Sequence, residues 1–451
     1  MALTNRKMRA ILAHAAGRGL GGYPQFYNPI IGTAGDSLIQ HGVDGSAPGT
    51  LNAHQTNAGE LVLAQQLHQR FRHDNWPFDT TTMTPANDRY TTGANQAISG
   101  SDVVSHRTMI LNYLLPMKPH IVFYRPTINS TVGSGTGAAT AAYVIATFEM
   151  IIASGSYVAL GTLPPWVNDA ANAFNGADNL ANRAVINAAI KAYAATLPKS
   201  KGLFIDYDDA LDPLRTGWTD RANMSDYIHL GTQGALKCAR LINQALDLII
   251  PPRNYALELW NTGLNKYPYA KLEGNGGVTA NGTGSTPTGM RTQRGGTGSS
   301  TLALSSEDNL ETGGKTRIFD ITGVGTGATA YYQLGIGTTG DFTVTGQTGQ
   351  WVRSMAEIEV MGNDALLVPQ LWANGRRALY DNGWSGLIGD AQQQTYWLVT
   401  DAVQVGSDTA NLSIRLYPNA DRAIASGNAT MRAKVKRLGY FFVENPRLAY
   451  A

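Results

Sequence analysis

Three short segments of the chain contain the side chains that acyl transfer requires. Ser37 lies in a Gly-Asp-Ser-Leu segment at residues 35–38, Asn129 lies farther along, and Asp226 precedes His229 by three residues. A serine hydroxyl is a weak nucleophile, so it needs a base within hydrogen-bond reach and a third group that orients the base. We expect Ser37 to be the nucleophile and His229 its general base. Asp226 would hold the imidazole tautomer and stabilise the imidazolium.

Short apolar runs precede Ser37 and Asn129, and we expect these runs to form the strands that position the two side chains. They predict strands at residues 30–34, 120–124, 157–162 and 202–207. Helix-like stretches, some rich in alanine, predict helices at residues 59–71, 102–115, 137–153, 170–197 and 232–248. Strands that alternate with helices form parallel βαβ units, so we predict a parallel sheet covered by helices on both faces. The functional site is then expected at the carboxyl ends of the strands.

The chain has a different pattern after residue 252. Pro251 and Pro252 end the last predicted helix, because proline cannot continue it. Residues 274–300 contain nine Gly and nine Ser or Thr, and they form either a flexible linker or tight turns within a β-structure. Later runs, several of which alternate apolar and polar residues, predict strands at 316–322, 330–336, 342–345, 351–361, 365–372, 396–404, 411–417 and 431–443. We predict an all-β domain of the sandwich or jelly-roll type.

Length and composition limit the class of protein. A chain of 451 residues is long enough for two or three domains, which we place at 24–252 and 253–451 after an N-terminal helical segment at 1–23. Hydrophobic residues make up 43%, which excludes a globally disordered chain. The formal net charge of +2 predicts no affinity for nucleic acid or for anionic membranes.

Targeting, membrane and metal signals are weak or missing. The first residues are too interrupted for a signal peptide, and no apolar run reaches the roughly 18 residues needed to span a bilayer. Cys238 is the single cysteine, so neither a disulfide framework nor a cysteine-based zinc site is expected. The histidines other than His229 show no ligand spacing, so we expect no metal site.

Four blocks occur in an order that resembles a known family. They are Gly-Asp-Ser-Leu at 35–38, a stretch that ends at Gly100, Thr-Ile-Asn-Ser at 127–130 and Asp-Tyr-Ile-His at 226–229. In this order they resemble the blocks of the SGNH hydrolases, also called GDSL-type esterases and lipases, over about residues 24–250. The third block departs from the family's usual Gly-x-Asn-Asp, because a threonine and a serine replace the glycine and the aspartate. This departure suggests an altered loop and pocket.

The resemblance implies a flavodoxin-like, three-layer α/β/α domain and a mechanism without a metal or organic cofactor. It implies that the backbone N–H groups of Ser37 and Gly100 and the side-chain amide of Asn129 stabilise the oxyanion. Asp36 is expected to brace the nucleophile loop rather than to react. Each residue also has a structural alternative. Ser37 and Gly100 could be turn residues, His229 a core side chain and Asn129 a loop support, while Asp226 could cap the helix near Thr232, although Thr232 itself is better placed for that cap.

Two tryptophans are candidates for contact with a substrate. Trp166 follows the predicted strand at 157–162 and either stacks on a sugar ring or packs within its own loop. Trp384 lies in a turn-like segment of the β-rich half, where aromatic faces suit the C–H surfaces of sugars. No long apolar stretch surrounds Ser37 or His229, which favours a short acyl group such as acetate.

These features predict a serine esterase that removes short acyl groups from an acylated poly- or oligosaccharide. The alternatives are a non-catalytic receptor-binding or structural protein on a decayed hydrolase scaffold, and a lipolytic esterase. The composition, with 15% charged residues, 50 Gly and one Cys, also resembles bacteriophage tail fibres and tailspikes. That likeness implies a protein of the virion tail or the extracellular space, an assembly role for residues 1–23, and a trimer.

Overall fold

The computed structural model describes residues 22–36, 39, 55–57, 59–76, 92–98, 100–224, 227–295, 301–322, 331–336, 340–362, 367–374, 376–380, 394–418 and 430–445. Three of the residues singled out above, Ser37, Asp226 and Trp384, lie outside this set. Most of the segment 1–23 lies outside it as well, so its helical character stays a prediction. Gly100, Asn129, Trp166 and His229 lie within the described part.

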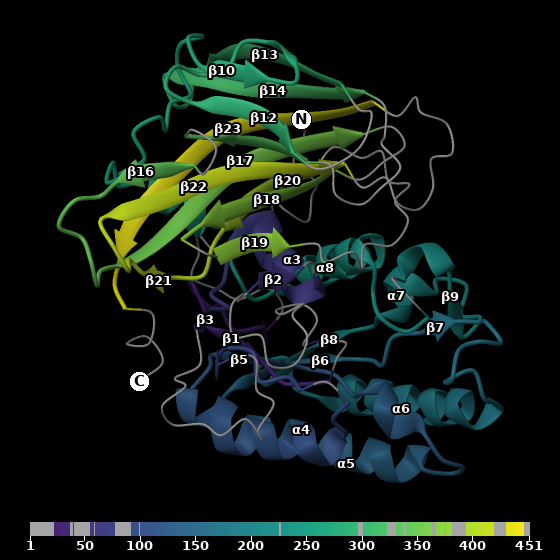
Figure 1. Cartoon of the computed structure of the whole chain (residues 1–451). Coiled ribbons are helices and arrows are strands. Elements are labelled where there is room, and N and C mark those ends of the chain that lie inside the picture. Colours follow the sequence, from purple (N-terminus) through teal and green to yellow (C-terminus); the bar gives the residue numbers. More distant parts are fainter. Residues whose placement is uncertain are drawn as a thin grey trace.

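A parallel sheet forms the centre of the N-terminal half (Figure 1). Its strand order is β1-β5-β6-β8, and neighbouring strands run parallel throughout. Each strand is short and almost entirely apolar, as expected for strands that are covered on both faces. All four predicted strands are confirmed, with the bounds β1 Ile31–Thr33, β5 Ile121–Tyr124, β6 Tyr157–Gly161 and β8 Gly202–Ile205.

Helices cover both faces of this sheet, so the predicted three-layer arrangement is confirmed. Alternate residues of a strand point to opposite faces, and β5 shows this directly. Phe123 packs in the core beneath α3 and α8, whereas Val122 packs in the core beneath α4, α5 and α6. The helices on the first face are α3 (Glu60–His68) and α8 (Thr232–Leu246), and those on the second are α4 (Val103–Met109), α5 (Gly137–Ala153) and α6 (Ala177–Thr196).

The ends of two helices differ from the prediction. Helix α6 begins at Ala177 rather than near residue 170, because the preceding residues form turns up to the N-cap Gly176. Helix α4 continues as a π-helical turn and then a 3₁₀ turn, and ends where Lys118 adopts a left-handed conformation. Shorter elements complete this half: β3 (Asn75–Trp76), β4 (Thr92–Gly93), β7 (Trp166–Val167), α7 (Asp208–Leu211) and β9 (Trp218–Thr219), together with 3₁₀ turns at Ile128–Thr131 and Arg221–Asn223.

The C-terminal half is a β-sandwich, as predicted. Its two sheets share an apolar core. The first sheet contributes Phe319, Ile358 and Val435 to this core, and the second contributes Leu334 and Ile414. The first sheet comprises β11 (Thr283–Gly284), β13 (Thr301–Asn309), β14 (Gly314–Thr322), β23 (Thr430–Val443), β17 (Trp351–Gly362), β20 (Gln394–Val399) and β21 (Val403–Gln404). The second comprises β10 (Val278–Ala280), β12 (Arg291–Gly295), β15 (Tyr331–Gly335), β22 (Thr409–Pro418), β18 (Leu367–Ala373), β19 (Arg376–Tyr380), β2 (Gln55–Asn57) and β16 (Asp341–Thr343).

The structure corrects several details of the β-rich half. The Gly-rich segment 274–300 is not a linker over its described part, because β10, β11 and β12 lie within it and pair into the two sheets. The single strand expected at 396–404 is two strands, β20 and β21, separated by residues 400–402. The sequence analysis missed β2, β13, β19 and the short helix α9 (Tyr255–Asn261).

The two halves pack against each other through α3 and α8, which lie between the parallel sheet and the sandwich (Figure 1). Gln66 of α3 pairs with the backbone of Val399 in β20, accepting from its N–H at 2.7 Å and donating to its carbonyl at 3.1 Å. Strand β2, from the N-terminal part of the chain, pairs in parallel with β19 of the sandwich. No helix in the described residues is long and apolar enough to cross a membrane.

Candidate active site

Asp36 anchors the nucleophile segment at the carboxyl end of β1. Its side chain is 1% exposed, and its Oδ2 accepts hydrogen bonds from the Thr127 hydroxyl and from Asn129 Nδ2, the latter at 3.2 Å. A buried carboxylate is stable only when its oxygens have such partners. The residue directly before Ser37 is therefore bonded to the asparagine block that follows β5, and this contact agrees with the bracing role expected for Asp36.

Thr127 is the first residue at which the third block departs from the Gly-x-Asn-Asp pattern, and its hydroxyl has two hydrogen-bond partners. It is the N-cap of the 3₁₀ turn at Ile128–Thr131, and its hydroxyl oxygen accepts from the Asn129 N–H at 3.1 Å while its proton goes to Asp36. A glycine has no hydroxyl to do this. Ser130 also has a defined partner, because its Oγ accepts from the N–H of Val103 at the start of α4 (3.1 Å). Both replacements therefore hold the loop in place rather than loosen it.

Gly100 and Ser101 connect the second block to the other two. Gly100 has a φ of +75°, a left-handed conformation that favours glycine. The Ser101 carbonyl accepts from Asn129 Nδ2 at 3.1 Å, and Ser101 Oγ lies 3.0 Å from the carbonyl oxygen of Gly35. The structure thus brings the described residues of the first three blocks together at one edge of the sheet. We call these contacts among Gly35, Asp36, Ser101, Thr127 and Asn129 the loop network.

His106 supports this network from below. Its Nε2 lies 3.0 Å from Ser101 Oγ, and the ring meets the edge of Tyr124 at 5.9 Å between centroids. Burial lowers the pKa of His106 to about 3, so the ring is neutral at physiological pH. Because Ser101 Oγ directs its proton to carbonyl oxygens (2.6 Å to Ile98), the His106 Nε2–H must be the donor in the contact between them.

The amide of Asn129 is already engaged by the protein. Its nitrogen carries two hydrogens, and these point to Asp36 Oδ2 and to the Ser101 carbonyl. In this conformation Asn129 joins the first two blocks. A role as oxyanion donor requires one of these two bonds to be exchanged for a bond to the substrate, and that role stays a prediction.

His229 lies in a loop that leads into α8. The side chain is half-buried, and the loop is held by hydrogen bonds from Val167 N–H to Tyr227 O (3.0 Å) and from Gly231 N–H to Asn223 O (2.9 Å). Helix α8 begins at Thr232 with Gly231 as its N-cap, and no side chain caps it. The expectation that Thr232 is the N-cap is therefore wrong, since Thr232 is already the first helical residue.

Trp166 is part of the packing beneath the site rather than a free surface. It is 1% exposed, and it packs with Ile128 and Leu163 in a small apolar cluster. The Arg183 guanidinium lies over its ring, with 5.9 Å between Cζ and the ring centroid. In this structure neither face of the ring is open to a sugar, so loop packing, the alternative named for Trp166, describes its position. Among the aromatic residues of the sandwich, Tyr332 is likewise buried.

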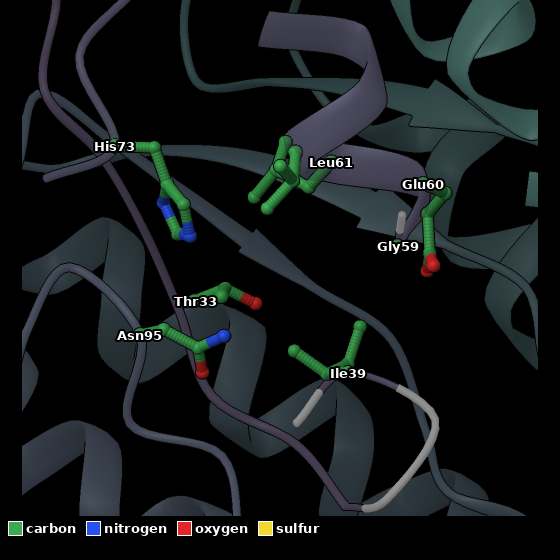
Figure 2. A pocket seen from close by; sticks show the side chains of 8 residues that line it. Thr33, Ile39, Gly59, Glu60, Leu61, His73 and Asn95 are labelled. Atoms are coloured by element: carbon green, nitrogen blue, oxygen red, sulfur yellow. The ribbon is translucent and has the colours of Figure 1, made fainter. Parts of the chain in front are cut away.

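A small pocket lies beside β1, next to the start of α3 (Figure 2). Thr33, Ile39, Leu61 and Asn95 line it, and the ring of His73 points into it. His73 Nδ1 lies 2.8 Å from the Ile31 carbonyl, so this nitrogen carries the proton, while Nε2 has no partner. Burial lowers the pKa of His73, which keeps the ring neutral. The pocket is therefore a mixed apolar and polar cavity without a charged imidazole.

A buried ion pair adjoins the same edge of the sheet. Arg125 follows β5 directly and bonds Glu60 at 2.8 Å, and its guanidinium lies over the ring of Tyr207, at 5.3 Å from the centroid. The sequence analysis did not single out Arg125, Glu60, Ser101 or His106. Nothing in local sequence shows which carboxylate an arginine will meet 65 residues away. Within the described ranges, no group of three or more His, Cys, Asp or Glu side chains is arranged to hold a metal ion.

Comparisons with known proteins place this chain beside several hydrolase structures. It is similar to a protein assigned to the GDSL-like lipases from Parabacteroides merdae (16% identity, 50% of this chain and 98% of that one, TM-score 0.36). It is also similar to a GDSL-like lipase from Bacteroides thetaiotaomicron (14%, 54% and 97%, TM-score 0.33) and to an acetylxylan esterase from Geobacillus stearothermophilus (14%, 50% and 96%, TM-score 0.34). No protein-family model matches the sequence, and no curated protein matches it.

Proposed function

We propose that this chain is a serine esterase of the SGNH type that removes short acyl groups, O-acetyl in particular, from a carbohydrate. The loop network carries this proposal. It joins Gly35 and Asp36, which directly precede Ser37, to Ser101 and Asn129. The loop network lies at the carboxyl ends of β1 and β5, the edge at which folds with open parallel sheets bind their ligands.

In the proposed reaction, Ser37 Oγ attacks the carbonyl carbon of the ester and His229 takes its proton. The tetrahedral oxyanion is stabilised by the backbone N–H groups of Ser37 and Gly100 and by Asn129, once its amide exchanges one of its present bonds. His229 then returns the proton to the departing sugar oxygen, which leaves an acyl-serine. Water attacks the acyl group with His229 again as base, and this step releases the carboxylic acid and restores Ser37. Asp226 orients the imidazole in both steps.

The sandwich supports a polymeric substrate, because hydrolysis of a small ester does not need a second domain of this size. Trp384 remains the proposed sugar contact and lies outside the described residues. Trp397, another aromatic residue of the sandwich, already has the Arg437 guanidinium 5.5 Å from its ring centroid. A short acyl group remains the proposal, because no long apolar stretch surrounds Ser37 or His229 in the sequence.

The test is hydrolysis of p-nitrophenyl acetate by the full-length protein, with Ser37→Ala as the variant. Loss of the nucleophile should lower kcat by up to about 10⁶-fold, while circular dichroism shows an unchanged fold. Ser134→Ala is the matched control, since Ser134 is an exposed serine in the turn before α5 and should leave activity unchanged. Equal hydrolysis by wild type and Ser37→Ala would refute the proposal.

Two further measurements separate the alternatives. Mass spectrometry of acetate released from acetylated bacterial polysaccharides and xylan tests the substrate class directly. A series of p-nitrophenyl esters tests chain length, where a maximum beyond eight carbons would favour a lipolytic esterase. A wild-type protein that hydrolyses none of these esters but binds polysaccharide would instead indicate a non-catalytic receptor-binding protein.

A further inference from the structure

A small apolar cluster supports two of the proposed catalytic residues from below. Its buried members are Ile128, Leu163 and Trp166, which are 2%, 0% and 1% exposed, and Ile228 packs against them. Ile128 directly precedes Asn129, and Ile228 directly precedes His229. Two loops that are 100 residues apart in the chain therefore rest on the same side chains.

Backbone contacts tie the tryptophan's strand to the histidine loop as well. Strand β7, which contains Trp166, pairs in parallel with β9, with Trp166 opposite Trp218. The next residue, Val167, donates its N–H to the carbonyl of Tyr227 at 3.0 Å, two residues before His229. Strand β7 therefore holds the His229 loop in place through one hydrogen bond, to Tyr227, and through the apolar cluster that Trp166 shares with Ile228.

Helix α6 holds the Trp166 loop rigidly. Asn187 accepts from the Leu163 N–H at 2.8 Å and donates to the Leu163 carbonyl at 2.9 Å. Arg183 donates to the Leu163 and Pro164 carbonyls at 3.2 Å, and its guanidinium is fixed by an ion pair with Asp208. All of these partners are buried or nearly so, so the loop cannot shift without breaking several buried hydrogen bonds.

From this arrangement we propose that Trp166 is a positioning residue, whose ring sets the separation between Asn129 and His229. This inference rests on the proposed esterase function and deepens it. Acyl transfer needs the oxyanion donor and the general base in one fixed geometry, and a displacement of about 1 Å can cost about 10²-fold in rate. Trp166 Nε1 is buried and has no hydrogen-bond partner, so the ring acts through its shape and not through its polar atom.

The test compares Trp166→Ala and Trp166→Phe in the full-length protein. Trp166→Ala should lower kcat for p-nitrophenyl acetate about 10- to 100-fold and leave KM within about threefold, because the base and the donor move apart while binding of a small ester is retained. Trp166→Phe keeps a six-membered aromatic ring and loses the five-membered ring with its unpartnered N–H, so its kcat should fall less than that of Trp166→Ala.

Phe319→Ala is the matched control for stability, because Phe319 is fully buried in the core of the sandwich and truncation of a buried Phe or Trp to Ala has a similar cost. It should lower Tm by a similar amount to Trp166→Ala and leave kcat unchanged. A second readout does not depend on turnover. The imidazole proton resonances of His229, assigned by their loss in His229→Gln, should shift in Trp166→Ala and not in Phe319→Ala.

The outcomes are distinct. A folded Trp166→Ala with wild-type kcat and unshifted His229 resonances would overturn the inference. An equal fall of kcat in Phe319→Ala at equal loss of Tm would also overturn it, because the effect would then be general destabilisation. A wild-type protein without esterase activity would refute the proposed function instead, and the His229 resonances would still decide whether Trp166 positions that side chain.

Discussion

At the scale of single residues, the candidate site depends on polar side chains that are buried or half-buried and almost completely paired. Thr127, Asn129 and Ser101 each bond groups of another loop, and a neutral histidine, His106, completes the set. A hydrogen-bond network of this kind favours a single geometry when every member has a partner. Loss of one member leaves a polar group unpaired and destabilises the folded protein. Thr127 therefore holds this loop through a hydrogen bond that a glycine at the same position could not form.

His106 gives the first prediction, which concerns pH. Its pKa in the folded protein is about 3, mainly because burial disfavours the charged ring, whereas an unfolded chain has the ordinary value of 6.5. Above pH 6.5 both states are neutral and the full stability is present. Below it the unfolded state binds the proton first, so stability is lost as pH falls from 6.5 towards 3. The loss between pH 6.5 and pH 5 should reach up to about 2 kcal/mol.

His106→Gln removes this titration and retains an N–H donor for Ser101. In urea unfolding, the free energy of the wild type should therefore fall more between pH 7 and pH 5 than that of the variant. His73, a second buried histidine whose pKa is lowered, is present in both proteins and cancels in the comparison. An identical pH dependence in wild type and variant would contradict the assignment of a neutral His106.

At the scale of elements, helices α5 and α6 lock the turn that contains Asn129. Gly137, at the start of α5, donates its N–H to the side chain of Asn182 in α6 at 2.9 Å. Asn182 also donates to the carbonyl of Thr131, at the end of the 3₁₀ turn, at 2.8 Å. One asparagine therefore connects two helices and the loop between β5 and α5. The close approach of the two helices is possible because residue 137 has no Cβ.

Gly137→Ala tests this close approach. A Cβ at residue 137 would lie 2.9 Å from the Cα of Asn182, so the helices must move apart. Although alanine has the higher helix propensity, the variant should lose about 1–3 kcal/mol in the free energy of unfolding. The control is Gly406→Ala, where an added Cβ meets nothing within 4 Å and stability should stay unchanged. A Gly137→Ala protein as stable as wild type would show that the contact can relax freely.

At the scale of the whole molecule, buried polar groups hold the α/β half and the sandwich together. Arg353 of β17 donates to Asp74 at 2.5 Å, and Arg72 bonds the other oxygen of the same carboxylate at 2.7 Å. Burial alone would raise the pKa of Asp74, but the two guanidinium groups outweigh it and lower that pKa to about 2. Gln69 adds a bond to the carbonyl of Trp397 at 2.7 Å. The sandwich is therefore bonded to the α/β half and not simply tethered by the chain.

Arg353→Met should destabilise the full-length protein by about 3–5 kcal/mol, because it leaves a buried carboxylate with one cation instead of two. The matched control is Arg432→Met, since Arg432 forms an exposed ion pair with Asp320 (48% and 36% exposed side chains) and should cost less than about 1 kcal/mol. The double variant Asp74→Leu with Arg353→Met should recover part of the loss. Urea unfolding measures all three, and equal effects of Arg353→Met and Arg432→Met would show that the buried pair does not join the halves.

Periodicity along the chain was sufficient to predict the four parallel strands, the helices between them and most strands of the sandwich. These features depend on residues that are close in sequence, since apolar spacing reflects which faces are buried. The blocks around Ser37, Gly100, Asn129 and His229 were also visible at this level, because each is a short run beside a predicted strand or helix.

Only the tertiary structure decided which distant residues meet. It placed Trp166 in a buried cluster with Ile128 and Ile228 rather than on the surface, bonded Thr127 to Asp36 across 91 residues, and paired β2 with β19 of the sandwich. It also showed that the described part of the Gly-rich segment belongs to the sheets. The physical reason is the same in each case. Contacts between elements depend on how buried faces pack in three dimensions, and local spacing determines which face is buried but not what covers it.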